Sequence, residues 1–160
     1  MSKELIKTAV MGRRQALKSV GLGALALAGT GFATQDAQAT PEKATEYLAK
    51  MTGGATAKEG RVKVKLPEIA ENGRTVPITI SVDSPMTDAD HVKAVHVVAE
   101  GNPTPEVVSF HMTPAMGKAE VSTRMRLGKT QNVRAAAIMS DGSVYAGTKQ
   151  VKVTIGGCGG

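Results

Sequence analysis

The only cysteine of this 160-residue chain, Cys158, stands near the end of the sequence between two pairs of glycines. A cysteine thiolate is a nucleophile, and its sulfur can carry reversible adducts such as disulfides and persulfides. Glycine has no Cβ, so the backbone on both sides of the thiol is slender and conformationally free. The four glycines are Gly156, Gly157, Gly159 and Gly160. They predict a flexible carrier arm over 156–160 that presents one sulfur atom to other molecules.

The usual alternative for a single free cysteine is a buried and unreactive thiol. Cys158 does not fit this alternative, because it follows the last segment with a strand pattern and has no apolar neighbours in sequence. An odd cysteine in an exported protein indicates intermolecular pairing or a reactive thiol. We therefore interpret Cys158 as a site of covalent attachment.

Residues 1–39 have the pattern of a twin-arginine export signal. Arg13-Arg14 precedes an apolar run from Val20 to Ala28, and Ala37-Gln38-Ala39 offers a cleavage site of small residues. The run is shorter than the ~20 apolar residues that span a bilayer, so a membrane anchor is disfavoured. We expect cleavage after Ala39 and a periplasmic protein without a membrane segment in its mature form.

The positive charge of the chain belongs partly to this signal. The formal charge is +6, but residues 1–39 hold five basic and two acidic side chains, which leaves +3 for residues 40–160. The remaining basic residues are scattered along the sequence. The only aromatic residues within 40–160 are Tyr47, Phe110 and Tyr145. Nucleic-acid binding requires a basic stripe with stacking aromatics, so this class of partner is excluded.

A short helix followed by strands is predicted for residues 40–155. Thr40-Pro41-Glu42 is typical of a helix start, and Gly53-Gly54 of a helix end, which gives a helical segment over 40–54. Seven segments of alternating or β-branched character follow: Val62–Leu66, Val76–Val82, Val92–Ala99, Val107–Met112, Ala119–Leu127, Val133–Met139 and Val144–Ile155. The pattern predicts a mainly β domain over 55–155, an immunoglobulin-like antiparallel β-sandwich of about seven strands.

Histidine and methionine residues provide the candidates for a metal site. His96 and His111 are expected on neighbouring strands, with His91, Met112 and Met116 nearby in sequence. Copper is the metal that Met and His ligands would favour, but no spacing matches a zinc motif, and methionine on a strand more often fills a core. No pattern of a nucleophile with its base, of paired carboxylates or of a phosphate loop is present, so we predict no metal, no cofactor and no catalysis by this chain alone.

Two lysines precede the arm on the last predicted strand. Lys149 and Lys152 would belong to a solvated strand face, or their charge would favour the Cys158 thiolate and its anionic adducts. An exposed thiol with its ordinary pKa of about 8.5 is mostly protonated at neutral pH, so an enzyme that uses it would have to activate it.

Together these features resemble the SoxY family, the sulfur-carrier subunits of the bacterial thiosulfate-oxidising (Sox) system. The terminal Gly-Gly-Cys-Gly-Gly is the specific part of the resemblance. Internal stretches that also resemble the family are Val76–Ile80, Asp83–Met86, Gly101–Pro105, Ser122–Leu127 and Ser140–Gly142.

The resemblance implies a covalent carrier whose attachment site is Cys158. It implies a heterodimer with a SoxZ-like subunit. A c-type cytochrome would join thiosulfate oxidatively to the cysteine, and a manganese-dependent hydrolase would release sulfate and leave a persulfide. A sulfane dehydrogenase, where present, would oxidise the remaining sulfur.

Two other functions are compatible with these residues. Ubiquitin-like sulfur carriers end in Gly-Gly and carry a thiocarboxylate, although they act in the cytoplasm, which the export signal disfavours. The chain could also be an exported binding or structural protein in which Cys158 forms an intermolecular disulfide, or in which Met and His bind copper.

Overall fold

A computed structural model describes residues 40–157 of the chain. The predicted export signal over 1–39 and residues 158–160, which include Cys158, lie outside the described residues. Within residues 40–157, one helix precedes eight strands and a single 3-10 turn. The elements are α2 (Pro41–Met51), β1 (Val62–Lys65), β2 (Ile69–Asn72), β3 (Val76–Val82), β4 (Val92–Ala99), β5 (Glu106–His111), η1 (Pro114–Met116), β6 (Glu120–Met125), β7 (Gln131–Met139) and β8 (Val144–Ile155).

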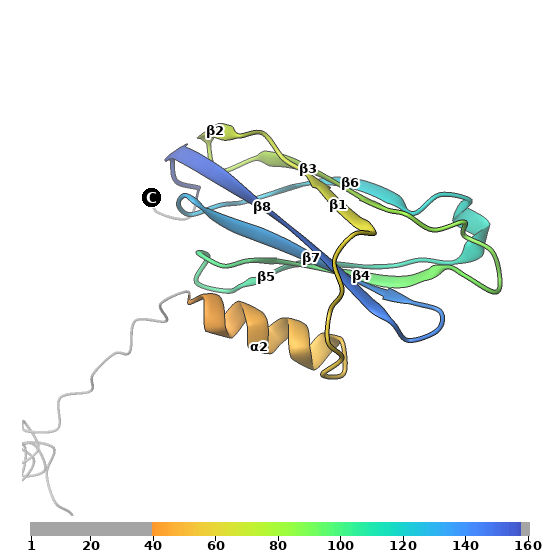
Figure 1. Ribbon diagram of the computed structural model, residues 1–160. Coiled ribbons are helices and arrows are strands. Elements are labelled where there is room, and N and C mark those ends of the chain that lie inside the picture. The colour runs from red at the N-terminus through yellow and green to blue at the C-terminus, as the bar shows by residue number, and fades with distance from the viewer. Residues whose placement is uncertain (1–39, 158–160) are drawn as a thin grey trace, which may run out of the picture. The chain divides into compact units, whose positions relative to one another are not determined.

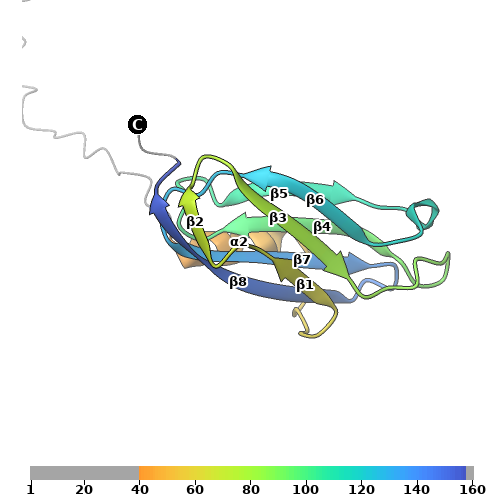
Figure 2. The ribbon, with the colours of Figure 1, turned by 90° about the horizontal axis from the view of Figure 1, so that it is seen from above.

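The strands form two sheets that pack face to face (Figures 1 and 2). One sheet has the order β1-β3-β6 and the other the order β2-β8-β7-β4-β5. Every pairing is antiparallel except that of β2 with β8, which is parallel. The prediction of a mainly β sandwich with a short helix before it is confirmed.

Strand β2 is the element that the sequence pattern did not predict. Its four residues, Ile69-Ala-Glu-Asn72, include three of low strand propensity. They become a strand because β8 supplies a neighbour: Ile69 pairs with Lys152, and Asn72 pairs with Ile155. A pairing between segments about 80 positions apart leaves no local signal in the sequence.

The core between the sheets is aliphatic. Strand β3 alternates between buried and exposed positions, as expected for a strand with one face in the core. The largest fully buried side chains are Ile78, Ile80, Leu127, Met139, Val76, Val92, Val95, Val97, Val98, Val133, Val144 and Val151. No aromatic residue is among them, which agrees with the aromatic-poor composition.

Helix α2 covers the outer face of the five-stranded sheet (Figure 1). Thr40 caps its first turn, with Oγ1 accepting a hydrogen bond from the Lys43 amide over 3.4 Å. Ala44 and Leu48 are buried and pack against Val98, Ala136 and Val144 of β4, β7 and β8. This cover explains why β4 is buried at nearly every position, on both faces of the sheet. The described residues contain no helix that could cross a membrane.

The sandwich has two ends with different loops. The tail end carries the loops over 73–75, 100–105 and 126–130 together with residues 156–157, which follow the end of β8 (Figures 1 and 2). The far end carries the loop over 83–91 and the β7–β8 turn over 140–143.

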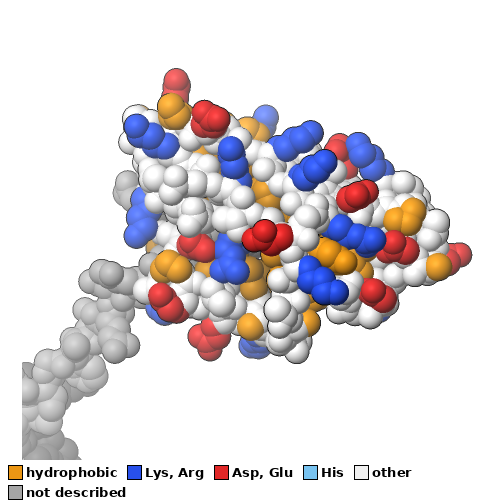
Figure 3. All heavy atoms as spheres, viewed as in Figure 1, with side chains coloured by type: hydrophobic (Ala, Val, Ile, Leu, Met, Phe, Trp, Pro, Cys, Tyr) orange, Lys and Arg blue, Asp and Glu red, His pale blue; other side chains and the backbone are white. Residues whose placement is uncertain are grey.

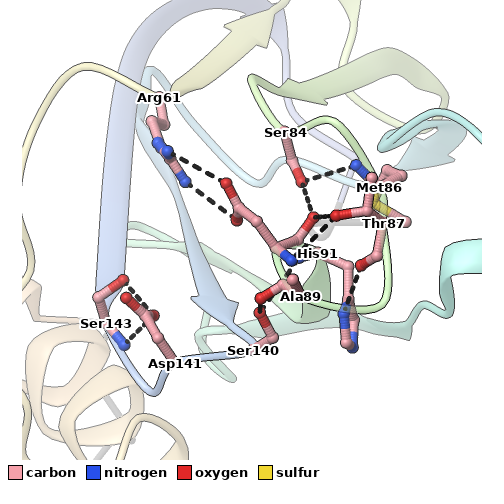
Figure 4. A network of polar contacts seen from close by, with 10 residues as sticks. Arg61, Ser84, Met86, Thr87, Ala89, His91, Ser140, Asp141 and Ser143 are labelled. Atoms are coloured by element: carbon pink, nitrogen blue, oxygen red, sulfur yellow. Dashed lines mark hydrogen bonds and ion pairs between the residues drawn. The ribbon is translucent and has the colours of Figure 1, made fainter.

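Polar contacts fix the far end (Figure 4). Ser140 Oγ donates to the Ala89 carbonyl oxygen over 3.1 Å and accepts from the His91 amide over 3.2 Å, so it joins the two loops. Arg61 forms an ion pair with Asp90 at 3.4 Å, and its guanidinium lies 5.1 Å from the centre of the Tyr145 ring. In the turn, hydrogen bonds from the Ser143 hydroxyl and amide lower the pKa of Asp141. The Ser84 Oγ accepts a hydrogen bond from the Met86 amide over 3.2 Å, so the stretches Asp83–Met86 and Ser140–Gly142 both have structural roles at this end.

Candidate functional site

The segment that leads to Cys158 is held by the tail end of the sandwich. The Gly73 amide donates to the Ile155 carbonyl oxygen over 2.7 Å, and the Leu127 amide donates to the Gly73 carbonyl oxygen over 2.8 Å. The Gly157 amide then donates to the Leu127 carbonyl oxygen, also over 2.8 Å. Backbone hydrogen bonds thus join three chain segments. We call Gly73, Leu127, Gly128, Gly156 and Gly157 the glycine seat.

Glycine is required in the seat because the backbones approach too closely for a side chain. A Cβ on Gly73 would collide with the Leu127 carbonyl oxygen and stand 2.8 Å from the Gly157 nitrogen. A Cβ on Gly156 would collide with the Gly128 carbonyl oxygen, and one on Gly157 with the Gly73 carbonyl group. The conformational freedom expected for the arm over 156–160 is therefore restricted at Gly156 and Gly157. Gly159 and Gly160 lie outside the described residues.

A buried amide pair holds the loop between β6 and β7 in place. Asn102 Nδ2 donates to the Arg126 carbonyl oxygen over 2.8 Å, and its Oδ1 accepts from the Gly128 amide over 3.0 Å. The Gln131 side chain donates to the same Oδ1 over 3.0 Å and accepts from the Gly101 amide over 2.6 Å. Asn102 and Gln131 are only 8% and 6% exposed. Sequence analysis did not predict this pair, since asparagine beside glycine and proline is typical of an ordinary turn.

Cationic residues stand next to the seat in the chain. Arg74, Arg126 and Lys129 are exposed, and each directly follows or precedes a seat residue. None of them takes part in an ion pair found among residues 40–157. Their charges favour anions at the tail end, including a thiolate. Charges of both signs are interspersed on the face seen in Figure 3.

The two lysines considered from sequence both lie on β8. Lys149 is half-buried and pairs with Val133 of β7. Lys152 is exposed and pairs with Ile69 of β2, three residues before the end of the strand. Neither has an ion-pair partner within the described residues. A solvated strand face and a charge that favours the Cys158 thiolate therefore both stay predictions for these lysines.

The histidines do not assemble into a metal site. His96 and His111 lie on neighbouring strands as expected, with ring centres 6.4 Å apart in an edge-on arrangement. The His96 Nδ1 is 2.7 Å from Ser109 Oγ, and burial is the main cause that lowers the His96 pKa. His91 is at the far end, where its Nδ1 lies 3.0 Å from the Thr87 carbonyl oxygen. Within residues 40–157, no three His, Cys, Asp or Glu side chains come together to hold a metal ion.

The two methionines considered as copper ligands lie in different environments. Met112 is buried in the core cluster, and Met116 lies in the turn η1 with 46% of its surface exposed. Met112 therefore has the structural role that methionine commonly has, filling space among aliphatic side chains.

Comparison with known proteins identifies the family. The family model described as "Sulfur oxidation protein SoxY" matches residues 48–158. The solved structure of the sulfur carrier protein SoxY from Chlorobium limicola f thiosulfatophilum is 35% identical, covers 71% of this chain and 98% of its own, and superposes with a TM-score of 0.60. No curated protein sequence matched the chain.

Other solved structures share the fold alone. A superoxide reductase (neelaredoxin) from Ignicoccus hospitalis is 21% identical, with coverage of 71% of this chain and 92% of its own and a TM-score of 0.52. A putative superoxide reductase from Thermotoga maritima is 17% identical, with coverage of 61% and 93% and a TM-score of 0.52. The family model spans most of the described domain and ends on the cysteine itself. The chain belongs to the SoxY family of sulfur oxidation proteins.

Proposed function

We propose that this protein is a periplasmic sulfur carrier that holds thiosulfate-derived intermediates covalently on Cys158 while partner enzymes act on them. The observation that carries the proposal is the family match over residues 48–158, which ends at the only thiol of the chain. The glycine seat supports the proposal, because its hydrogen bonds hold Gly157, the residue directly before that thiol. Export by the twin-arginine route would follow from Arg13-Arg14 and the apolar run after them.

The first proposed step loads the carrier. The Cys158 thiolate and the terminal sulfur of thiosulfate form an S–S bond, and the two electrons that are lost pass to a c-type cytochrome. The product is a cysteine S-thiosulfonate with one negative charge. The cations next to the seat, Arg74, Arg126 and Lys129, would stabilise both the thiolate and this adduct.

The second proposed step releases sulfate. Water attacks the sulfonate sulfur and breaks its bond to the bridging sulfur, which yields sulfate, a proton and a persulfide on Cys158. A manganese-dependent hydrolase would perform this step. A sulfane dehydrogenase, where present, would oxidise the outer sulfur of the persulfide to an S-sulfonate, with water as the oxygen source and with the six electrons that are lost passing to a c-type cytochrome. A further hydrolysis of the S–S bond would release a second sulfate and return the free thiol.

The carrier itself contributes no catalytic group in this proposal. Its contributions are the covalent bond, which keeps reactive sulfur from solvent, and the short tether, which raises the effective concentration of cargo at each enzyme. A SoxZ-like subunit is the proposed permanent partner. An aliphatic core without large aromatic residues favours a protein that completes its burial in a heterodimer.

Intact mass of the protein isolated from its source tests the function directly. The carrier proposal expects added sulfur atoms or a thiosulfonate group, located by peptide mass spectrometry on Cys158. A thiocarboxylate would place the extra sulfur on the terminal carboxylate instead. A disulfide-linked dimer or a bound copper ion, with no sulfur cargo, would support the binding or structural alternative and overturn the proposal.

A further inference from the structure

Leu127 occupies the centre of the glycine seat. Its amide donates to Gly73 and its carbonyl oxygen accepts from Gly157, while its side chain is fully buried in the core. The residue therefore connects the interior of the sandwich to the start of the carrier arm. Any movement of Leu127 would be passed to the residue that precedes Cys158.

The Asn102 amide bridges the peptide units on both sides of Leu127. It bonds to the Arg126 carbonyl oxygen and to the Gly128 amide, and Gln131 in turn bonds to Asn102. A buried side-chain amide is costly unless its hydrogen bonds are made, and here they are made to the backbone of a single loop. No buried polar side-chain atom within residues 40–157 lacks a partner. Such a network makes one loop conformation strongly preferred.

The neighbouring loop of the seat is fixed in the same manner. Asn72 Oδ1 accepts from the Arg74 amide over 2.9 Å and so closes a tight turn around Gly73. Thr130 Oγ1 accepts from the Val153 amide over 3.0 Å and ties the end of β8 to the β6–β7 loop. The backbone that receives Gly156 and Gly157 is therefore ordered by side chains from three loops.

Anchoring Gly157 changes how far the thiol can travel. Three residues beyond Ile155 correspond to a reach of about 10 Å, whereas one residue beyond a fixed Gly157 corresponds to about 3.3–3.6 Å. A shorter tether confines its cargo to a smaller volume and so raises its local concentration at one place.

We propose that the glycine seat is an anchor that sets the position from which Cys158 is presented, and that Gly73 and Asn102 are positioning residues for cargo delivery. This inference rests on the proposed carrier function and deepens it. Gly73 acts by leaving room for Gly157, and Asn102 acts through the Leu127 loop.

Gly73→Ala is the principal test, and Gly147→Ala is its matched control. Both add one methyl group where a backbone carbonyl is too close; at Gly147 a Cβ would stand 2.5 Å from the Val62 carbonyl oxygen. Gly147 lies on β8 about 26 Å along the strand from its end, at ~3.3 Å per residue. Asn102→Asp is a second variant of unchanged size that loses the bond to the Arg126 carbonyl oxygen.

Three measurements on the full mature chain with its partner subunit separate the outcomes. They are hydrogen exchange at the Gly157 amide, alkylation of Cys158 by iodoacetamide, and kcat/KM for the carrier with its thiosulfate-loading enzyme. We expect Gly73→Ala and Asn102→Asp to accelerate the exchange and to lower kcat/KM by about three- to tenfold, the change that one lost hydrogen bond produces. Alkylation should change less than about twofold in Gly73→Ala, because this substitution leaves the local charges the same. Gly147→Ala should leave exchange at Gly157 and kcat/KM unaltered.

Equal loss of kcat/KM in Gly73→Ala and Gly147→Ala would overturn the anchor, since general destabilisation would then explain both. A rise in kcat/KM for Gly73→Ala would also overturn it, because the seat would then restrain delivery. The carrier function has a separate test: if unaltered protein carries sulfur on Cys158 and turns over normally, that function stands whatever the seat variants do.

Discussion

The Gly157 amide donates a 2.8 Å hydrogen bond to the Leu127 carbonyl oxygen, so the residue before the only cysteine is tied to the loop between β6 and β7. Gly156 and Gly157 are therefore held against the loops of the sandwich by close backbone contacts, which a free chain end would not make.

Gly157→Val should destabilise the folded protein. The new Cβ would collide with the Gly73 carbonyl group and stand 2.6 Å from the Arg74 nitrogen, so the tail must leave the seat or the loop must move. We expect a loss of about 1–3 kcal/mol in the free energy of unfolding, the usual cost of forcing extra atoms into a packed site. Denaturant unfolding measures it, and an unchanged midpoint would contradict the packing seen here.

Gly159→Val tests the other side of the thiol. Our sequence-based expectation is unchanged unfolding, unchanged alkylation of Cys158 and a sharp fall in enzymatic turnover, because a branched side chain widens and stiffens the arm. If turnover stays the same, the outer glycines have no role in delivery.

Cys158→Ser should abolish thiosulfate-dependent activity in the reconstituted system. Serine keeps nearly the same shape but cannot form the S–S bond that loads the carrier. The free energy of unfolding should stay within about 0.5 kcal/mol of the original, as for substitutions away from packed features. Full activity in this variant would refute the carrier function.

The folded protein should lose stability as the pH falls below the ordinary histidine pKa of about 6.5. Burial lowers the pKa of His96, the charge of His111 lowers it further, and Glu106 raises it by a smaller amount. Below 6.5 the unfolded chain binds a proton that the folded chain takes up only at lower pH, so acid favours unfolding until the folded pKa is passed.

His96→Gln should flatten this pH dependence, and His91→Gln, at the far end of the sandwich, is the matched control. Unfolding midpoints measured between about pH 7.5 and 5.5 provide the comparison. Equal slopes for the original protein and His96→Gln would show that another group controls acid sensitivity.

Ser140→Ala should destabilise the protein more than Arg61→Met. Ser140 Oγ makes two hydrogen bonds between the loops of the far end, and their loss should cost about 1–3 kcal/mol. The Arg61–Asp90 pair joins side chains that are about one-third exposed, and such pairs contribute at most about 1 kcal/mol. Thermal unfolding of both variants measures the order, which would be reversed if the ion pair were dominant.

The proposed heterodimer predicts that the unfolding temperature depends on the concentration of the partner subunit. If a SoxZ-like subunit binds only the folded chain, the unfolding temperature should rise with the concentration of that subunit. A chain that is monomeric, unfolds cooperatively and serves the pathway enzymes without any partner subunit would contradict the heterodimer.

Local signals made most of the fold predictable. Thr40-Pro41 and Gly53-Gly54 mark the ends of the helix, and strict alternation marks β1 and β3. These patterns are readable because the causes lie within a few residues. Strand β2 was not predictable, because its cause is the distant edge of β8.

The candidate site, like the fold, was predictable only where a signal lies within a few residues. Cys158 and its glycines stand out in the sequence. Glycine, however, occurs both where the backbone is flexible and where two backbone segments approach closely, and only the neighbouring backbone shows which case applies. Asn102 and Gln131 have no local signature, since their partners, the backbones of Gly101, Arg126 and Gly128, come together only in the folded chain.

The parallel pairing of β2 with β8 has a mechanical consequence. Strand β8 lies between β2 and β7, and β2 flanks only its last residues, from Lys152 to Ile155. In the proposed carrier function, an enzyme that pulls on the cargo would load β8 along its axis. The ladder bonds to β7, along Val144–Val151, and to β2, along Lys152–Ile155, run across that direction. They would therefore share the load in shear and would not open one at a time, so the domain would resist being drawn into the enzyme together with its tail.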